Sequence, residues 1–176
     1  MAIELGIGIP IAIVLYRLQS KSSDRIEEMT RTVADLTKQK ARTEQEKKAF
    51  ECQRIIDHLQ DIQNVEQDVK TYLTQYKLGD PTLKIFVGKP FSFMTNSNIR
   101  QMKDALGQLQ SGLNDNSLRE QFLDYLPQFN VVPKRILADN FPQQEQQRDY
   151  LLDFIDDQMK KIQAFIDRFN KEMDFS

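Results

Sequence analysis

The chain has 176 residues, 40% of them apolar and 28% charged, which is enough for one domain with extensions. These values fit a small core attached to a long exposed helix better than a uniformly globular chain. The net charge of −2 gives no general attraction to nucleic acid, so no nucleic-acid partner is expected. The single cysteine, Cys52, excludes an intramolecular disulfide.

The first distinctive segment is apolar and extends from Ile3 to Leu18. Its uncharged part, Leu5 to Tyr16, is shorter than the roughly 20 residues of an ordinary membrane-spanning helix. The flanking charges of Glu4 and Arg17 could nevertheless reach the two interfaces of a bilayer. We therefore predict a single transmembrane anchor over residues 1–19. The residues expected to form it are Ile3, Leu5, Ile7, Ile9, Ile11, Ile13, Val14, Leu15, Tyr16, Arg17 and Leu18.

The orientation of this anchor follows from the basic residues around it. None precedes the apolar segment, whereas Arg17, Lys21 and Arg25 follow it. Because basic residues stay in the cytoplasm, the N-terminus is expected outside and residues 20–176 inside the cell. The main alternative is that the short segment is a buried core element. A cleaved signal peptide is disfavoured because Glu4, and no basic residue, precedes the apolar run.

A helical stalk is predicted over residues 20–54. From Asp24 to Tyr76 the chain contains neither glycine nor proline. Apolar residues recur there in the alternating three-four spacing of a coiled-coil seam, which predicts self-association into a possible homo-oligomer. The seam residues are Ile26, Met29, Val33 and Leu36. The same register continues through polar residues, among them Lys40 and Thr43, so we expect pairing to weaken there.

The register of apolar residues shifts near Ile55, where a wider stripe begins. A wide stripe is typical of a helix that faces a globular core rather than one partner helix. We therefore predict a helical bundle domain over residues 55–176. The new seam consists of Ile55, Leu59, Ile62, Glu66, Val69, Leu73 and Tyr76, and Ile56 and Val65 widen it.

The rest of the bundle is predicted from caps, prolines and apolar periodicity. The run from Leu83 to Phe93 is strand-like, and without a second strong strand it predicts an extended connector or a marginal hairpin. Helices are expected from Asn98 to about Gln110, from the capping box of Ser117 and Glu120 to Pro127, near 133–138, and from about 144 to 173. The fold class is therefore mainly α.

No group of residues predicts catalysis, a metal site or a cofactor site. His58 is the only histidine, and a zinc site needs more histidine or cysteine ligands than the chain supplies. Cys52 and His58 are six residues apart, so they share a helix face poorly, and we discount a Cys-His nucleophile pair. The acidic residues Asp57 and Asp61 are typical of a solvated helix face. We therefore expect a protein without enzymatic activity.

Three functions remain open from the sequence. The first is a membrane-anchored structural or adaptor protein that self-associates or presents a cytoplasmic bundle to an unknown protein partner. The alternative is a soluble helical regulatory or ligand-binding bundle with the N-terminal apolar segment buried. The third is an enzyme with a hidden site around Asp57, His58 and Asp61.

Overall fold

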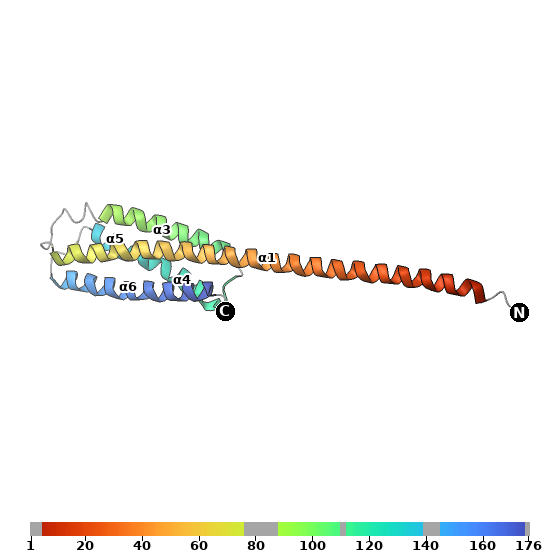
Figure 1. Cartoon of the computed structure of the whole chain (residues 1–176). Helices are drawn as coiled ribbons and strands as arrows, with labels where there is room; N and C mark the ends of the chain where they lie inside the picture. The colour runs from red at the N-terminus through yellow and green to blue at the C-terminus, as the bar shows by residue number, and fades with distance from the viewer. Residues whose placement is uncertain (1–4, 76–87, 110–111, 139–144, 175–176) are drawn as a thin grey trace. The chain divides into compact units, whose positions relative to one another are not determined.

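The computed structural model describes the backbone of residues 5–75, 88–109, 112–138 and 145–174, and side chains from residue 26 onward within these ranges. The described chain is almost entirely helical, so the prediction of a mainly α fold is confirmed for it (Figure 1). The elements are α1 (Leu5–Gln75), α3 (Lys89–Gln108), α4 (Asn116–Tyr125), the 3₁₀ helix η2 (Leu126–Asn130), α5 (Val131–Leu137) and α6 (Glu145–Met173).

Contacts divide the chain into two units, Met1–Glu46 and Lys47–Ser176. The described side chains of the first unit, from Ile26 to Glu46, are all exposed. Pairs spaced four residues apart stabilise this part of α1 modestly, as in the ion pair of Arg31 with Glu27 at 2.6 Å. The predicted domain boundaries at residues 19/20 and 54/55 stay predictions.

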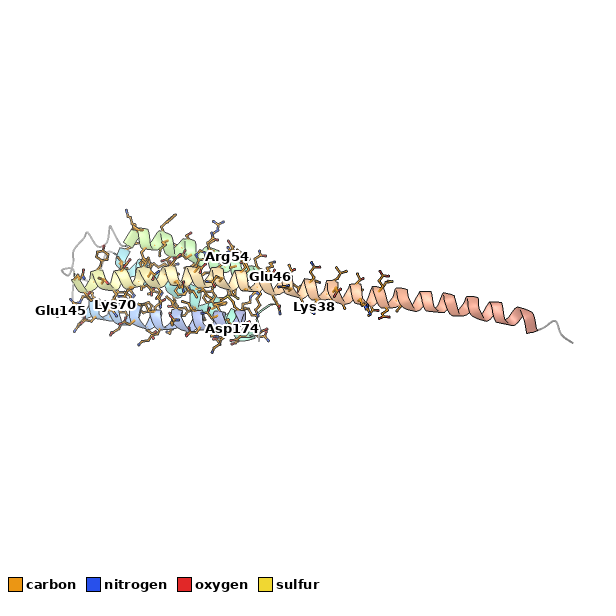
Figure 2. The ribbon with its side chains drawn as sticks, viewed as in Figure 1. Lys38, Glu46, Arg54, Lys70, Glu145 and Asp174 are labelled. Atoms are coloured by element: carbon orange, nitrogen blue, oxygen red, sulfur yellow. The ribbon has the colours of Figure 1, made fainter. Side chains whose placement is uncertain are left out.

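The second unit is a helical bundle in which α3 and α6 lie alongside the C-terminal part of α1 (Figure 1). Two ion pairs show that α6 is antiparallel to α1. Lys48 contacts Glu172 at 2.7 Å near one end, and Lys70, labelled in Figure 2, contacts Asp156 at 2.5 Å toward the other. The predicted wide stripe of α1 faces the core, because all its described residues except Val65 are buried, and Val65 packs against the core.

The apolar core of this bundle forms two separate clusters. The larger cluster contains Ile62 of α1, Ile99 of α3 and Ile162 of α6, and it also takes in α4 and η2. The smaller cluster contains residues of α1, α3, α5 and α6 from the other end of the bundle. Its buried members are Val69, Leu73, Phe91, Val132, Ile136, Leu151 and Ile155.

The predicted membrane anchor and localisation are corrected by the structure. Among the helices of the described residues, none combines the length and the apolar character needed to cross a bilayer. The physical reason is the short uncharged run from Leu5 to Tyr16, about 18 Å of helix against a hydrocarbon core of about 30 Å. Helix α1 continues from this run through polar residues such as Gln19 and Lys21. The side chains predicted to form the anchor lie outside the described ones.

The predicted strand-like connector is also wrong in its described part. Helix α3 begins at Lys89, well before the expected start at Asn98, with Pro90 in its first turn, where its missing N–H costs nothing. Phe91 is buried in the smaller core cluster. Burial of Phe91 on a helix face therefore outweighs the strand propensity of the local sequence. Residues 83–87 lie outside the described ranges.

Two predicted helix boundaries differ in detail. The N-cap of α4 is Asp115, whose carboxylate accepts hydrogen bonds from the backbone N–H groups of Ser117 and Leu118. The residue that caps α4 is therefore Asp115, two positions before the expected cap at Ser117. Pro127 does not end the helical path, because it lies in the first turn of η2, which continues directly into α5.

Candidate functional site

A layer of buried polar side chains separates the two apolar clusters of the bundle. On α1, Glu66 lies between Ile62 of the larger cluster and Val69 of the smaller one. On α6, Gln158 is flanked in the same way by Ile155 and Ile162. Each helix therefore passes through a polar position where it leaves one cluster for the other.

Helix α3 contributes to the same level of the core. Thr95 and Asn98 are buried between Phe91 of the smaller cluster and Ile99 of the larger one. The polar layer is therefore made of four residues from three helices. These are Glu66, Thr95, Asn98 and Gln158.

The polar layer is unusual because its members lack hydrogen-bond partners among the described residues. Both carboxylate oxygens of Glu66 and both amide atoms of Gln158 are buried without a partner. The same holds for the Thr95 hydroxyl and the Asn98 amide nitrogen. Such groups ordinarily cost about 1–3 kcal/mol each, so native proteins rarely retain several of them at one level of a core. Their concentration here calls for an explanation beyond packing.

Glu66 is the ionisable member of the polar layer. Its side chain is fully buried, and this burial raises its pKa to about 8. The carboxyl group is therefore mostly neutral near pH 7 in the folded chain, because an isolated charge in an apolar surrounding is costly. A positive group brought next to it would make the charged form favourable again.

A surface pocket of about 500 Å³ opens beside the polar layer, between α4, η2 and α6. Gln158 belongs both to the layer and to the pocket wall, although only 1% of the residue is exposed. The other residues that line the pocket are Gln121, Asp124, Tyr125, Gln128, Phe154, Asp157 and Lys161. The pocket thus combines two aromatic rings with amides and two carboxylates.

Glu66 lies close behind this pocket. In the antiparallel pair of α1 and α6, Lys70 meets Asp156, which places Glu66 at the level of Gln158 one turn further along. The pKa of Tyr125 is raised by burial, then by the charges of Glu66 and Asp157. The negative charge of Glu66 therefore acts on Tyr125 in the pocket wall, although Glu66 is not one of the lining residues.

The rim of the pocket already holds an ammonium group of the chain itself. The Lys161 side chain is 2.7 Å from Asp157 and lies over the Tyr125 ring, 5.6 Å from its centroid. The carboxylate attracts the cation, and the ring adds a cation–π contact. Asp124 has no such cation in a described ion pair, so the rim retains an excess of negative charge.

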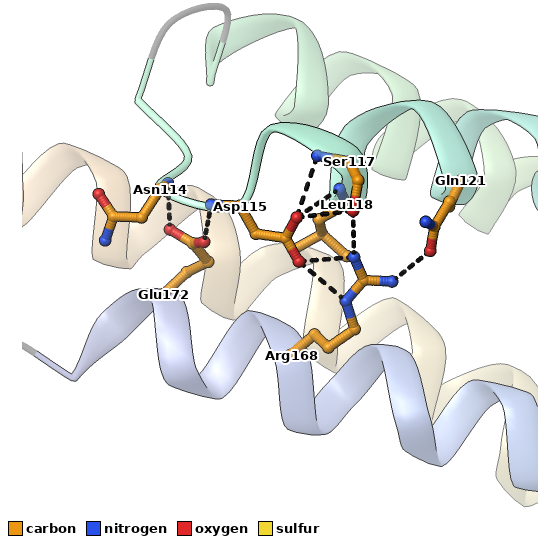
Figure 3. A network of polar contacts seen from close by, with 7 residues as sticks. All are labelled: Asn114, Asp115, Ser117, Leu118, Gln121, Arg168 and Glu172. Atoms are coloured by element: carbon orange, nitrogen blue, oxygen red, sulfur yellow. Dashed lines mark hydrogen bonds and ion pairs between the residues drawn. The ribbon is translucent and has the colours of Figure 1, made fainter.

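A second polar cluster lies near the C-terminal end of α6, and its groups are well paired (Figure 3). Glu172 accepts hydrogen bonds from the backbone N–H groups of Asn114 and Asp115, each at 2.7 Å, and it pairs with Lys48. Burial opposes ionisation of Glu172, but the bonds from Lys48 and the two N–H groups hold its pKa below the usual value.

Arg168 completes this paired cluster. Its guanidinium donates to the Asp115 carboxylate at 2.6 Å and to the Gln121 side-chain oxygen at 2.6 Å. The bonds that Asp115 accepts from Arg168 and from Ser117 lower its pKa to about 2. Every partner here is supplied by the chain, so the cluster has a structural role in fixing the loop before α4 against α6.

The residues considered for enzymatic activity are Cys52, Asp57, His58 and Asp61, all on α1, and no described hydrogen bond joins them to one another. Cys52 is fully buried, and burial raises the pKa of its thiol to about 11, so it is a poor nucleophile. His58 lies 3.9 Å from Asp61, beyond hydrogen-bond distance, and Asp57 accepts a bond from Gln53. Within the described part of the chain, no group of three or more His, Cys, Asp or Glu residues could hold a metal ion.

The predicted self-association seam is exposed in the single chain. Between 59% and 68% of the surface is accessible in each of its members, Ile26, Met29, Val33 and Leu36. Their proposed role remains a prediction, because the structure contains one chain.

The sequence did not identify the pocket. Glu66 stood out only as a charged residue in an apolar seam, and Gln158 as one of many glutamines. The usable signal was a polar residue in an otherwise apolar stripe on both α1 and α6. Searches of family models, curated proteins and solved structures found no match to this chain.

Proposed function

We propose that this chain is a helical ligand-binding or regulatory bundle whose binding site is the pocket beside the polar layer. The observation that carries the proposal is Gln158, which is buried in the pocket wall with both amide atoms unpaired. A ligand with polar groups would satisfy these atoms. Binding pockets commonly combine apolar walls with a few convergent polar groups, as this pocket does.

The proposal is tested by a nuclear magnetic resonance screen with small amines, amides, acids and alcohols. Ligands should shift the Gln158 side-chain amide and the backbone resonances around Tyr125. Gln158→Met keeps the length of the side chain but removes its polar atoms, so it should abolish the response. Gln163→Met, on the exposed face of the same helix, is the matched control. A folded chain that responds to none of these molecules contradicts the proposal.

A second candidate function rests on the exposed seam. Four apolar side chains at heptad spacing on one helix favour pairing with a second copy of the chain through residues 26–36. In this proposal the paired helices form a structural element, as in an adaptor protein.

Sedimentation of the full chain tests this second candidate. Val33→Glu places a charge in the seam and should lower the mass to that of one chain. Ala34→Glu, on the neighbouring exposed position outside the seam, should leave the mass unchanged. A single-chain mass for the unaltered protein at high concentration would refute self-association.

A further inference from the structure

The pocket offers a specific chemistry to a ligand. Its aromatic residues, Tyr125 and Phe154, provide faces that attract cations and cover alkyl chains. Its carboxylates, Asp124 and Asp157, favour positive charge at the mouth. The buried Gln158 amide adds an unpaired acceptor oxygen in the wall. These features together favour a positively charged ligand over an anionic one.

Within the polar layer, Glu66 adds an acidic group that lacks a partner among the described residues. A carboxyl group that is fully buried among apolar residues, with neither oxygen hydrogen-bonded to a described residue, is destabilising unless a partner arrives. No described lysine, arginine or histidine forms an ion pair with it. The neighbouring residues of the polar layer, Thr95 and Gln158, are neutral and can accept hydrogen bonds. A positively charged N–H donor suits the unpaired oxygens of Glu66, Thr95 and Gln158, whereas the unpaired N–H groups of Asn98 and Gln158 need an acceptor.

We propose that the pocket binds a small organic cation, a primary alkylammonium, whose head group lies between Gln158 and the carboxylates of Asp124 and Asp157 while its chain packs against Tyr125 and Phe154. This inference rests on the proposed function and adds the chemical class of the ligand. Lys161 shows that an ammonium group is accepted at the rim, where it contacts Asp157 and the Tyr125 ring.

Lys161 is also a competitor in this arrangement. Its ammonium occupies the Asp157 carboxylate and the face of Tyr125 that an incoming cation would use. Removing that charge should therefore strengthen binding of the ligand. Removing a charge elsewhere on α6 should not do so, since screening by salt weakens the effect of distant charges.

The test is a titration of the full chain with butylammonium chloride, followed by the resonances of Gln158 and by the melting temperature. Butyrate and butyramide are matched probes with the same number of carbon atoms and with negative or no charge. Sodium chloride at equal concentration controls for ionic strength. Butylammonium alone should shift the Gln158 amide in a saturable way and raise the melting temperature.

Two variants, each with a matched control, locate the cation within the pocket. Asp124→Asn should weaken butylammonium binding several-fold, because it removes a carboxylate at the mouth of the pocket while keeping the shape. Asp68→Asn, on the exposed face of α1, should leave it unchanged. Lys161→Gln should tighten binding several-fold, whereas Lys160→Gln, an exposed neighbour on α6, should not.

The outcomes separate this inference from the proposed function. If butyramide or butyrate saturates the Gln158 site and butylammonium does not, the ligand class is wrong but the binding pocket stands. Equal effects of Lys160→Gln and Lys161→Gln would also refute the cation site, because they would indicate general electrostatics. If no probe binds and a crystal structure shows only water against Gln158, both proposals fail.

Discussion

At the scale of single residues, Glu66 couples the stability of the bundle to pH. Its pKa is about 8 in the folded chain and about 4.3 when unfolded, so the folded state holds an extra proton between these values. Stability is therefore fully present below about pH 4.3 and is lost as pH rises toward 8. The loss should reach about 1.4 kcal/mol per pH unit inside this window.

The expected result is that Glu66→Gln removes this decline between pH 5 and pH 8. Urea unfolding at several pH values gives the free energy of unfolding as a function of pH. The slope of this curve is compared between the unaltered chain and Glu66→Gln. Asp68→Asn should keep the original slope, because Asp68 is exposed. Identical slopes for the unaltered chain and Glu66→Gln would mean that Glu66 is not the titrating group.

Cys52 gives a second prediction at this scale. Its thiol is fully buried and its pKa is raised to about 11, so the reactive thiolate is almost absent near neutral pH. The rate at which a thiol reagent labels Cys52 should therefore be limited by opening of the bundle, not by collision with the folded chain. We expect labelling to accelerate by orders of magnitude in denaturant, measured by mass spectrometry. Rapid labelling of the folded chain would contradict the described burial.

At the scale of elements, Glu172 connects α1, α6 and the loop before α4. Glu172→Gln removes the charge that pairs with Lys48 and weakens the bonds to two backbone N–H groups. The expected loss of stability at pH 7 is about 3 kcal/mol, because a lysine whose side chain is only 11% exposed is left without its partner. Chemical unfolding at pH 7 measures this loss.

The effect of Glu172→Gln should also depend on pH. The pKa of Glu172 is lowered in the folded chain, so its contribution is present above about pH 4.3 and is lost as pH falls further. The difference between the unaltered and altered chains should shrink in that acidic range. Glu120→Gln, an exposed change on α4, should cost little at any pH. A constant difference down to pH 3 would argue against an ionised Glu172.

The helical elements were predictable where one physical signal dominated. The apolar stripe of α1 from Ile55 to Leu73 predicted the buried face, because helix periodicity places those residues on one side. The start of α3 was missed because Phe91 and its neighbours have strand-like sequence but gain more by burial on a helix. The apolar segment after Ile3 was misread, because its hydrophobicity was weighed more heavily than its short length.

The candidate site was less predictable than the helices. A sequence shows that Glu66 interrupts an apolar stripe, but not whether another helix supplies its partner. Whether Gln158 has a hydrogen-bond partner depends on which residues of α1 lie opposite it. That register is visible only in the structure, where the ion pairs of Lys48 and Lys70 with α6 define it. Pocket volume likewise depends on how side chains from three elements pack.

At the scale of the whole molecule, the polar layer affects how cooperatively the bundle unfolds. The unpaired polar side chains between the two apolar clusters stabilise each other little. The bundle is therefore least stable at the boundary between the clusters. Domains with such internal boundaries can open in parts whose free energies differ. The smaller cluster, which involves the start of α3, α5 and the start of α6, is expected to open first.

Amide hydrogen exchange would reveal this partial opening. Residues around Ile155 should exchange at a lower opening free energy than those around Ile162, although both lie on α6. A ligand that satisfies the polar layer would join the two parts and bring their exchange rates together. The buried polar groups lower the stability of the empty bundle. Once a ligand satisfies them, the bundle should unfold as one cooperative unit instead of two, so the number of units would report whether ligand is bound.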